Sequence, residues 1–372
     1  MRGGQPTEAL YGRIERVDRS TPVASTKVVG QPRLTSLSHG GGCGCKIAPG
    51  VLADLLRESS PPAHAALLVG RETSDDAAVY RLDDTRAIVA TTDFFMPIVD
   101  DPFDFGRIAA TNALSDVYAM GGTPLFALAI VGMPVNVLPP ATIREILRGG
   151  EAVCASAGIP VAGGHSIDSV EPIYGLAAIG VVDPRLMKRN SGARIGDVIV
   201  LGKPLGVGIH SAALKKDELD AAAYDEMIAV TTRLNDVGPV IAAIEGVNAL
   251  TDVTGFGLLG HLVEVCRGSG VRASVRWNDV PLMESTVALA QRGHVTGASQ
   301  RNARSFDGEI DFTADVDALS SPILFDPQTS GGLLVTCAPG AAGAVLGAFR
   351  SAGFGAAAVI GEIVTGAGVG VG

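Results

Sequence analysis

The stretch Phe-Gly-Arg-Ile-Ala-Ala-Thr-Asn-Ala-Leu-Ser-Asp, residues 105–116, is the segment that says most about the fold. It lies in a helical pattern over residues 104–120, with Asp104 expected as the N-cap residue. The pattern is apolar on nearly every side, which is typical of a buried helix. Asn112, Ser115 and Asp116 are spaced i, i+3 and i+4, so they share one face. Because Asp is rarely buried without a partner, this polar stripe is either satisfied internally or lines a site.

Short apolar strands and helical patterns alternate on both sides of this helix. Before residue 184, strands are expected at 87–92, 125–133 and 173–182, and further helices at 49–58 and 140–157. After residue 196, strands are expected at 197–201, 273–277 and 332–337, and helices at 222–244, 255–266 and 340–352. The fold class predicted from this order is α+β.

The length of 372 residues exceeds the ~250 to 300 residues at which single hydrophobic cores stop growing. We therefore expect two α+β domains, residues 34–183 and 197–372, joined by a polar linker at 184–196. Residues 1–33 contain scattered arginines and are expected to be a disordered extension. This stretch has no apolar h-region, so it does not predict a secretory signal.

Composition excludes several classes of function. The chain has 29 basic and 39 acidic residues, a net charge of −10, so it offers no global attraction to nucleic acid or to an anionic membrane. The chain contains no run of 18 or more apolar residues, so no membrane-spanning helix is predicted. Five cysteines, an odd and sparse set, do not predict a disulfide framework, and a cytoplasmic location is expected.

A glycine-rich segment, His-Gly-Gly-Gly-Cys-Gly-Cys-Lys (39–46), directly precedes the first predicted helix. Its glycines let the backbone approach a ligand closely. Lys46 and the nearby helix N-terminus are expected to favour the thiolate of Cys43. A zinc site is disfavoured because the chain has no second cysteine pair at ligand spacing. A redox pair of the thioredoxin type is disfavoured because Cys-x-Cys is not the thioredoxin spacing. From the residues alone, a reactive thiol and an incidental glycine loop both remain open.

Isolated aspartates lie near the ends of several apolar elements. They are found in the run Thr-Ser-Asp-Asp (73–76) and at Asp93, Asp116 and Asp252. Helix caps and turns explain any one of them, but they explain the whole set less well. Magnesium prefers oxygen ligands and combines a few carboxylates with substrate phosphates. The set therefore favours a nucleotide bound through metal ions.

The common nucleotide-binding motifs are absent. The only Gly-Lys pair, Gly202-Lys203, is followed by Pro204 and lacks the Ser or Thr of a Walker A motif. The glycines at 366–370 cannot be followed by a helix, as a dinucleotide-binding fingerprint requires. The run Gly-Gly-His-Ser (163–166), after the strand-like residues 159–162, offers N–H groups and a hydroxyl for phosphate, with a plain turn as the alternative. For the similar run at 326–332 a turn is expected.

Seven ordered segments of the chain together resemble the selenophosphate synthetase (selenide, water dikinase) family. The resemblance extends from about residue 34 to residue 361. The seven segments are residues 39–47, 72–80, 91–100, 105–116, 162–168, 251–261 and 326–332. The cysteine–glycine segment separates this family from relatives such as aminoimidazole ribonucleotide synthetase and thiamine-monophosphate kinase.

The resemblance implies a reaction, a fold and a set of partners. ATP, selenide and water give selenophosphate, AMP and orthophosphate, with Mg²⁺ as cofactor. The implied fold is two α+β domains of the aminoimidazole ribonucleotide synthetase-like superfamily. ATP binds to the N-terminal domain beneath a mobile Gly/Cys loop. The N-terminal sheet forms the interface of a homodimer. The pathway that the resemblance implies is selenocysteine biosynthesis.

The resemblance also implies roles for individual residues. Cys43 matches the essential position that is cysteine or selenocysteine in the family, and Lys46 matches a lysine that serves activity and contacts ATP. The implied magnesium ligands are Asp76, Asp116 and Asp252. The other implied nucleotide-binding positions are Thr73, Ser74, Asp75, Asp93, Gly164, His165 and Ser166, of which the last three reach across the dimer.

Two other functions remain open on the sequence. A related small-molecule kinase would release ADP rather than AMP. A non-catalytic selenium or metal carrier would bind through Cys43 and Cys45 without ATP turnover. Such a carrier has no use for the aspartates or for Lys46, so these residues distinguish the enzyme hypothesis from the carrier hypothesis.

Overall fold

The structure is a computed structural model that describes residues 32–47, 49–56, 64–70, 75–314 and 316–372. Nearly all of the extension predicted at 1–33 lies outside the described residues, as do the last two residues of the helix predicted at 49–58. Among the described residues, no helix combines the length and apolar character that a membrane crossing requires.

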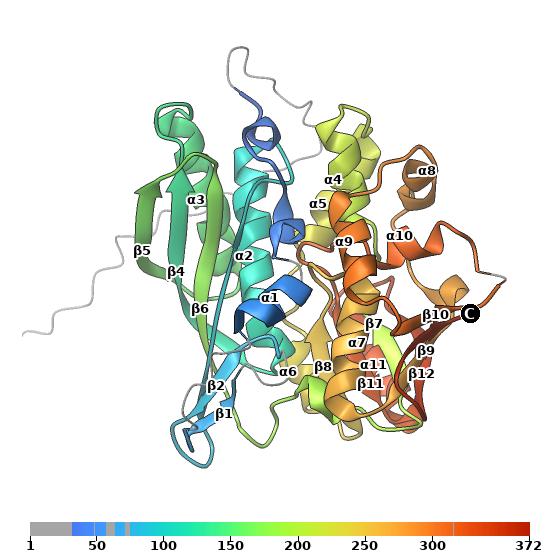
Figure 1. Cartoon of the computed structure of the whole chain (residues 1–372). Coiled ribbons are helices and arrows are strands. Elements are labelled where there is room, and N and C mark those ends of the chain that lie inside the picture. Colours follow the sequence, from blue (N-terminus) through green and yellow to red (C-terminus); the bar gives the residue numbers. More distant parts are fainter. Residues whose placement is uncertain (1–31, 48, 57–63, 71–74, 315) are drawn as a thin grey trace, which may run out of the picture. The chain divides into compact units, whose positions relative to one another are not determined.

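The described residues of the first half of the chain build one sheet and three α-helices (Figure 1). In chain order the elements are α1 (Pro49–Leu56), β1 (Leu67–Val69), β2 (Ala78–Arg81), β3 (Ala87–Phe95), α2 (Pro102–Ala119), β4 (Thr123–Met133), α3 (Pro140–Ser156), β5 (Val161–Asp168) and β6 (Ile173–Val182). The strand predicted at 173–182 is therefore confirmed at both ends, and β3 runs three residues beyond its prediction. The strand order is β1-β2-β3-β6-β4-β5, and only β4 and β5 run parallel.

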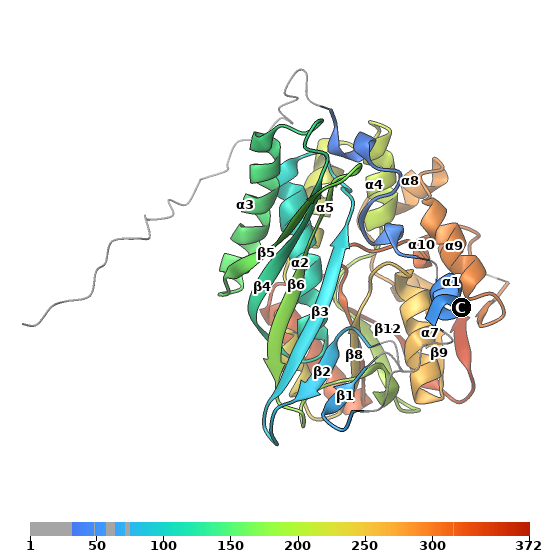
Figure 2. The ribbon, with the colours of Figure 1, turned by 60° about the vertical axis from the view of Figure 1, so that its left-hand side comes forward.

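One face of this sheet is covered by α2 and α3, which lie behind the strands in Figure 2. The alternation of side chains along β3 matches that arrangement: Val89, Asp93 and Phe95 are buried, whereas Ala90 and Phe94 are exposed. Odd-numbered residues of β3 thus face α2, and Asp93 is carried to the covered side of the sheet.

Helix α2 is the central element of the structure. It packs against β3, β6 and α3 in its own half and against β8 and α5 of the second half. Every residue from Ile108 to Ala119 is buried, which confirms the apolar pattern of the sequence. A Cβ on Gly106 would lie 1.9 Å from the carbonyl oxygen of Ile146, so this glycine lets α2 and α3 approach closely.

The predicted N-cap of this helix is wrong by one turn. The helix begins at Pro102, and the carboxylate of Asp101 accepts the N–H group of Asp104 at 2.8 Å. Proline is favoured in the first turn because its missing N–H group has no partner there. Asp104 is therefore an acidic residue within the first turn.

The second half of the chain builds a seven-stranded sheet and eight helices among its described residues. The elements are β7 (Val198–Leu201), α4 (Val207–Lys215), α5 (Ala221–Thr231), α6 (Gly238–Ala242), β8 (Val247–Asp252), α7 (Gly257–Ser269), β9 (Arg272–Val275), α8 (Thr286–Gln291), α9 (Gly297–Ser305), β10 (Ile310–Phe312), α10 (Ser320–Leu324), β11 (Leu333–Cys337), α11 (Ala342–Ser351), β12 (Ala358–Val364) and β13 (Gly368–Val371). The strand order is β10-β13-β9-β12-β7-β11-β8.

Two other predictions fail for backbone reasons. The helix expected at 222–244 is split into α5 and α6, because Gly238 and Pro239 start a new helix after a turn. Residues 163–166 do not form a loop: they belong to the edge strand β5, where Gly164, at φ +155, lies against the backbone of Ala129.

Candidate active site

Four acidic side chains from both halves of the chain gather around α2. They are Asp76, just before β2; Asp93, in β3; Asp116, in the last turn of α2; and Asp252, the last residue of β8. Strand β8 is brought there because it contacts α2 and forms the edge of the second sheet. The carboxylates that the sequence separates by up to 176 positions thus share one site.

Hydroxyl groups from neighbouring elements hold three of these carboxylates. Thr251 Oγ1 donates to Asp76 Oδ1 at 2.7 Å, and Thr91 Oγ1 donates to Asp116 Oδ2 at 2.5 Å. Ser115 Oγ donates to Asp252 Oδ2, which joins α2 to β8. Thr91 and Thr251 were not predicted as site residues, although a threonine one or two positions before an aspartate at a strand end was a usable signal.

The carboxylates raise one another's pKa values. Burial raises the pKa of Asp76, and the charges of Asp252 and Asp116 raise it further. Burial raises the pKa of Asp116 in the same way, with Asp252 and Asp93 adding to the effect. For Asp252, burial raises the pKa and the hydrogen bond from Ser115 opposes the rise. Such a cluster favours a bound cation, since crowded carboxylates are stable as anions only near positive charge.

Lys46 supplies one positive charge. Its Nζ lies 3.7 Å from Asp93 Oδ1, and its side chain is 41% exposed, so it can also meet a ligand. The charge of Asp93 raises the pKa of Lys46 despite the opposing effect of burial. Lys46 is therefore a lasting cation at the edge of the carboxylate cluster.

Cys43 lies inside the site. Its side chain is 1% exposed, and its Sγ donates to Asn112 Oδ1 on α2 at 3.2 Å. Burial, followed by the charge of Asp93, raises the pKa of Cys43 well above its ordinary value, and Lys46 lowers it only in part. The expectation that the thiolate is favoured is therefore wrong for this arrangement, because the loss of water outweighs the nearby lysine.

Asn112 connects the cysteine to the carboxylates. Its Oδ1 also accepts the N–H group of Ser330 at 2.7 Å, and its Nδ2 donates to Asp93 Oδ2. Thr329 Oγ1 accepts the N–H group of Cys43 at 3.1 Å. The polar stripe on α2 is thus both satisfied and part of the site.

The segment 326–332 is a turn, as expected, but it is buried and supports the site. Asp326 Oδ2 accepts the N–H groups of Gly208 and Ile209, and Gln328 Oε1 accepts those of Gly206 and Val207, so the segment caps α4. Lys203 anchors the same segment: its buried Nζ donates to Ser330 O at 2.8 Å. Burial lowers the pKa of Lys203 to about 7.

The other predicted site residues are placed elsewhere. Asp75 Oδ1 accepts the N–H group of Asn190 at 2.7 Å, and Thr73 and Ser74 lie outside the described residues. Gly164, His165 and Ser166 are exposed on β5 and line a separate cavity of about 290 Å³. None of the four aspartates is among the described residues that line this cavity. Within one chain, the structure does not bring β5 to the carboxylate cluster.

The donor set suits magnesium when phosphate supplies further ligands. Within the described parts of the chain, no three His, Cys, Asp or Glu side chains form a ready-made metal site. Asp76 Oδ2 is nevertheless buried without a hydrogen-bond partner. An unpaired carboxylate oxygen beside other carboxylates is a hard donor of the kind that magnesium takes together with phosphate oxygens.

Two α+β halves around an acidic site define an AIR synthase-related protein. The family model described as AIR synthase related protein, N-terminal domain, matches residues 74–182, and that of the C-terminal domain matches residues 194–372. Among solved structures, the thiamine-monophosphate kinase of Stenotrophomonas maltophilia has the same fold, with a TM-score of 0.60 and 22% identity. The match covers 87% of this chain and 96% of that chain.

Curated relatives with high sequence identity indicate one family within this class. The selenide, water dikinase of Burkholderia pseudomallei is 68% identical over 90% of this chain and 95% of its own length. That of Paraburkholderia xenovorans is 65% identical over 94% of this chain and 98% of its own. The chain belongs to the selenide, water dikinase family.

Proposed function

We infer that this chain catalyses the ATP-dependent formation of selenophosphate from selenide and water, with release of AMP and orthophosphate. The observation that carries this inference is the gathering of four carboxylates, Lys46 and Cys43 at one site. Family membership at 65 to 68% identity supports the same reaction.

The acidic cluster calls for a cation before it can accept a polyphosphate, which carries about four negative charges. Asp76, Asp116 and Asp252 would hold Mg²⁺, which neutralises phosphate charge when it is bound. The unpaired Asp76 Oδ2 supports this assignment. Thr91, Thr251 and Ser115 keep the carboxylates oriented through their hydrogen bonds.

Cys43 and Lys46 lie on the segment that covers this cluster. We propose that Lys46 offsets charge at the transferred phosphoryl group and that Cys43 guides selenium toward it. Because Cys43 is buried, the covering segment also keeps water away from the first transfer. The hydrogen bond from Cys43 Sγ to Asn112 holds the sulfur beside the polar stripe of α2, and the same amide donates to Asp93.

Several finer features belong to the same proposal. Thr73, Ser74, Asp75 and Asp93 bind the nucleotide from the same chain, and Gly164, His165 and Ser166 bind it from a second copy in a homodimer. The domains are residues 34–183 and 197–372. A cytoplasmic location is supported by the five cysteines, all of which are free.

The experiment that tests the reaction follows phosphorus by NMR after incubation with ATP, magnesium and selenide without oxygen. The expected products are selenophosphate, orthophosphate and AMP in equal amounts. ADP as the final nucleotide would indicate a small-molecule kinase. Selenium binding without ATP turnover would indicate a carrier.

A further inference from the structure

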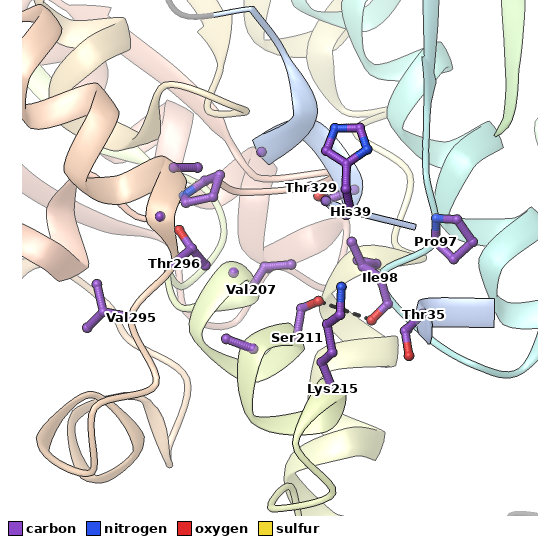
Figure 3. A pocket seen from close by; sticks show the side chains of 18 of the residues that line it. Thr35, His39, Pro97, Ile98, Val207, Ser211, Lys215, Val295, Thr296 and Thr329 are labelled. Carbon is purple, nitrogen blue, oxygen red and sulfur yellow. Dashed lines mark hydrogen bonds between the residues drawn. The ribbon is translucent and has the colours of Figure 1, made fainter. Parts of the chain in front are cut away.

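A second cavity lies on the side of the glycine–cysteine segment (residues 39–46) that faces away from the carboxylate cluster. Its volume is about 360 Å³, in the range of pockets that bind small molecules. In Figure 3, Thr35, Pro97 and Ile98 lie on one side of the cavity and Val295 and Thr296 on the other, with His39 above Lys215.

The glycine–cysteine segment is the wall between this cavity and the carboxylates. Gly40, Gly41 and Gly44 line the cavity with backbone atoms alone, and Thr329, which accepts the N–H group of Cys43, lines it as well. Cys43 is not among the lining residues, because its thiol points to Asn112 of α2. A ligand in the cavity is thus separated from Cys43 by the thickness of one backbone segment.

The positive charge of this cavity comes from Lys215, Lys216 and Arg301, whereas His39 is paired with Glu171, which is not a lining residue. The ionisable side chains among its described lining residues are His39, Lys215, Lys216 and Arg301, and none of them is acidic. In a chain with a net charge of −10, a basic cavity beside a carboxylate cluster is a local feature with a steering effect on anions.

The cationic side chains of this cavity have N–H donors that are not used in hydrogen bonds within the described part of the chain. Lys215 Nζ donates to Ser38 O at 2.9 Å, and Arg301 Nη2 donates to Gly44 O at 3.0 Å. A lysine has three N–H donors and an arginine five, so most of these donors remain available. Lys216 makes no side-chain hydrogen bond or ion pair with any described residue.

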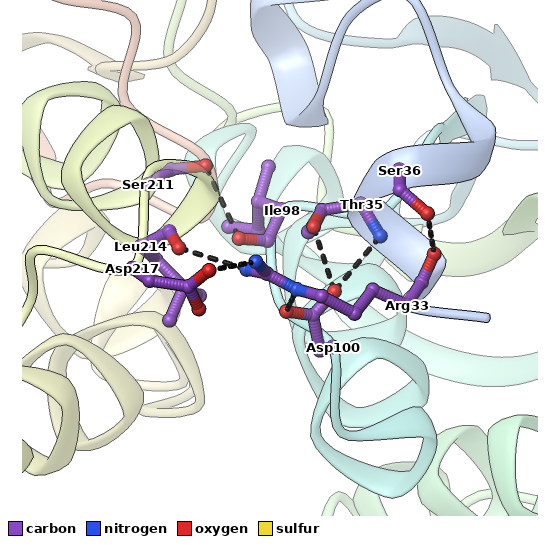
Figure 4. Close-up of polar contacts among 8 residues, drawn as sticks. All are labelled: Arg33, Thr35, Ser36, Ile98, Asp100, Ser211, Leu214 and Asp217. Atoms are coloured by element: carbon purple, nitrogen blue, oxygen red, sulfur yellow. Dashed lines mark hydrogen bonds and ion pairs between the residues drawn. The ribbon is translucent and has the colours of Figure 1, made fainter. Parts of the chain in front are cut away.

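The chain just before the glycine–cysteine segment is fixed to both halves of the protein through Arg33. Arg33 donates to Asp100 Oδ2 at 2.7 Å, to Asp217 Oδ2 at 2.8 Å and to Leu214 O at 2.9 Å (Figure 4). Arg33 is therefore occupied by acidic partners, whereas the lysines of the cavity are not.

We propose that this basic cavity binds the hydroselenide anion before its transfer to the phosphoryl group, an inference that rests on the proposed function. A small anion is repelled by four carboxylates, so it needs a positively charged approach to Cys43. The volume far exceeds the ~30 Å³ of a water molecule, so the ion enters with much of its hydration shell. The glycines of the wall leave no side chains between the ion and the segment that carries Cys43.

Lys216→Glu tests the proposal, because this side chain lines the cavity without holding any other residue in place. We expect the KM for selenide to rise about three- to tenfold, while the KM for ATP and the melting temperature stay unchanged. The difference from the parent should shrink in high salt, because exposed charges are screened. Arg144→Glu is the matched control, since Arg144 is an exposed cation on α3 and outside the cavity.

Three results would overturn the proposal: an unchanged KM for selenide, an equal rise in the Arg144→Glu control, or a rise in the KM for ATP as large as that for selenide. The last would assign the cavity to the nucleotide. A parent chain that forms no selenophosphate would refute the proposed function instead. Anaerobic calorimetric titration with sodium hydroselenide, without nucleotide, would then still test the cavity, and equal heats for the parent and Lys216→Glu would exclude it.

Discussion

Cys43 is a buried thiol that shares its hydrogen-bond partner with a carboxylate. Its sulfur donates to Asn112 Oδ1, and burial raises its pKa. Asn112 Nδ2 donates in turn to Asp93, so the thiol and a carboxylate share one amide. A change in charge at Asp93 would therefore reach the sulfur through a single side chain.

Substitution of the sulfur alone tests its role. In Cys43→Ser the hydroxyl group can still donate to Asn112, so we expect an unchanged melting temperature. Selenide-dependent AMP formation should fall at least ~100-fold, because oxygen does not replace sulfur as a partner for selenium. Quantification of AMP by chromatography measures this.

Cys45→Ser is the matched control for that substitution. Cys45 lies two positions away, with its sulfur near Gly40 and away from Asn112. It should retain turnover. Equal activity in Cys43→Ser and the parent would remove the proposed role of Cys43.

At the scale of elements, the N-terminus of α4 is closed by side chains from a distant segment. Asp326 and Gln328 together accept four consecutive N–H groups, from Gly206 to Ile209. This leaves no free donors there for a phosphate, in contrast to the usual anion site at a helix N-terminus. The segment 326–332 therefore positions Thr329 and Ser330 around Cys43 and Asn112.

The cap predicts a pH dependence of stability. Burial raises the pKa of Asp326 to about 7. Because this value lies above that of the unfolded chain, the stabilising contribution is complete at low pH and is lost as the pH rises through about 7. Asp326→Asn removes the titration, so its stability relative to the parent should improve by roughly 2 to 3 kcal/mol between pH 5 and pH 8.

Denaturant unfolding at the two pH values measures this change. Asp307→Asn, at an exposed carboxylate, is the matched control. A relative stability of Asp326→Asn that is the same at pH 5 and pH 8 would show that Asp326 does not titrate in this range.

The sequence predicted the helices and strands better than the contacts between them. Helix α2 and strand β6 follow from local periodicity, since each is long and consistently apolar. The break between α5 and α6 needed attention to Gly238 and Pro239, which a moderate helical pattern on both sides concealed. The role of segment 326–332 had no local signal, because its partners lie more than one hundred positions away in α4 and α2.

For the whole molecule, the site depends on contacts that no periodicity encodes. Ser115 and Asp252 are 137 positions apart, and Asp76 and Thr251 are 175 apart. The set of aspartates suggested a metal-bound phosphate, but only the packing of β8 against α2 brings the two halves of the set together. The resemblance to a known family supplied the residues that spacing alone did not.

The uncovered face of the first sheet supports the proposed homodimer. Phe94 of β3 is 50% exposed, and Leu125 and Leu128 of β4 and Ile167 of β5 are exposed in the same sheet. Exposed apolar side chains on a contiguous sheet mark an interaction surface. The same strands carry Gly164, His165 and Ser166, so a second copy docked on this face would also account for site residues that one chain leaves away from the aspartates.

Phe94→Glu tests the assembly and the shared site together. A buried charge at the interface should give a particle of about 38 kDa by light scattering instead of twice the chain mass of 37.9 kDa. If residues 164–166 serve the nucleotide of the partner, the monomer should also lose ATP turnover. Ile195→Glu, at an exposed apolar residue between β6 and β7, is the matched control and should remain dimeric. A Phe94→Glu monomer with full activity would show that each chain completes its own nucleotide site, and a monomeric parent would refute the dimer itself.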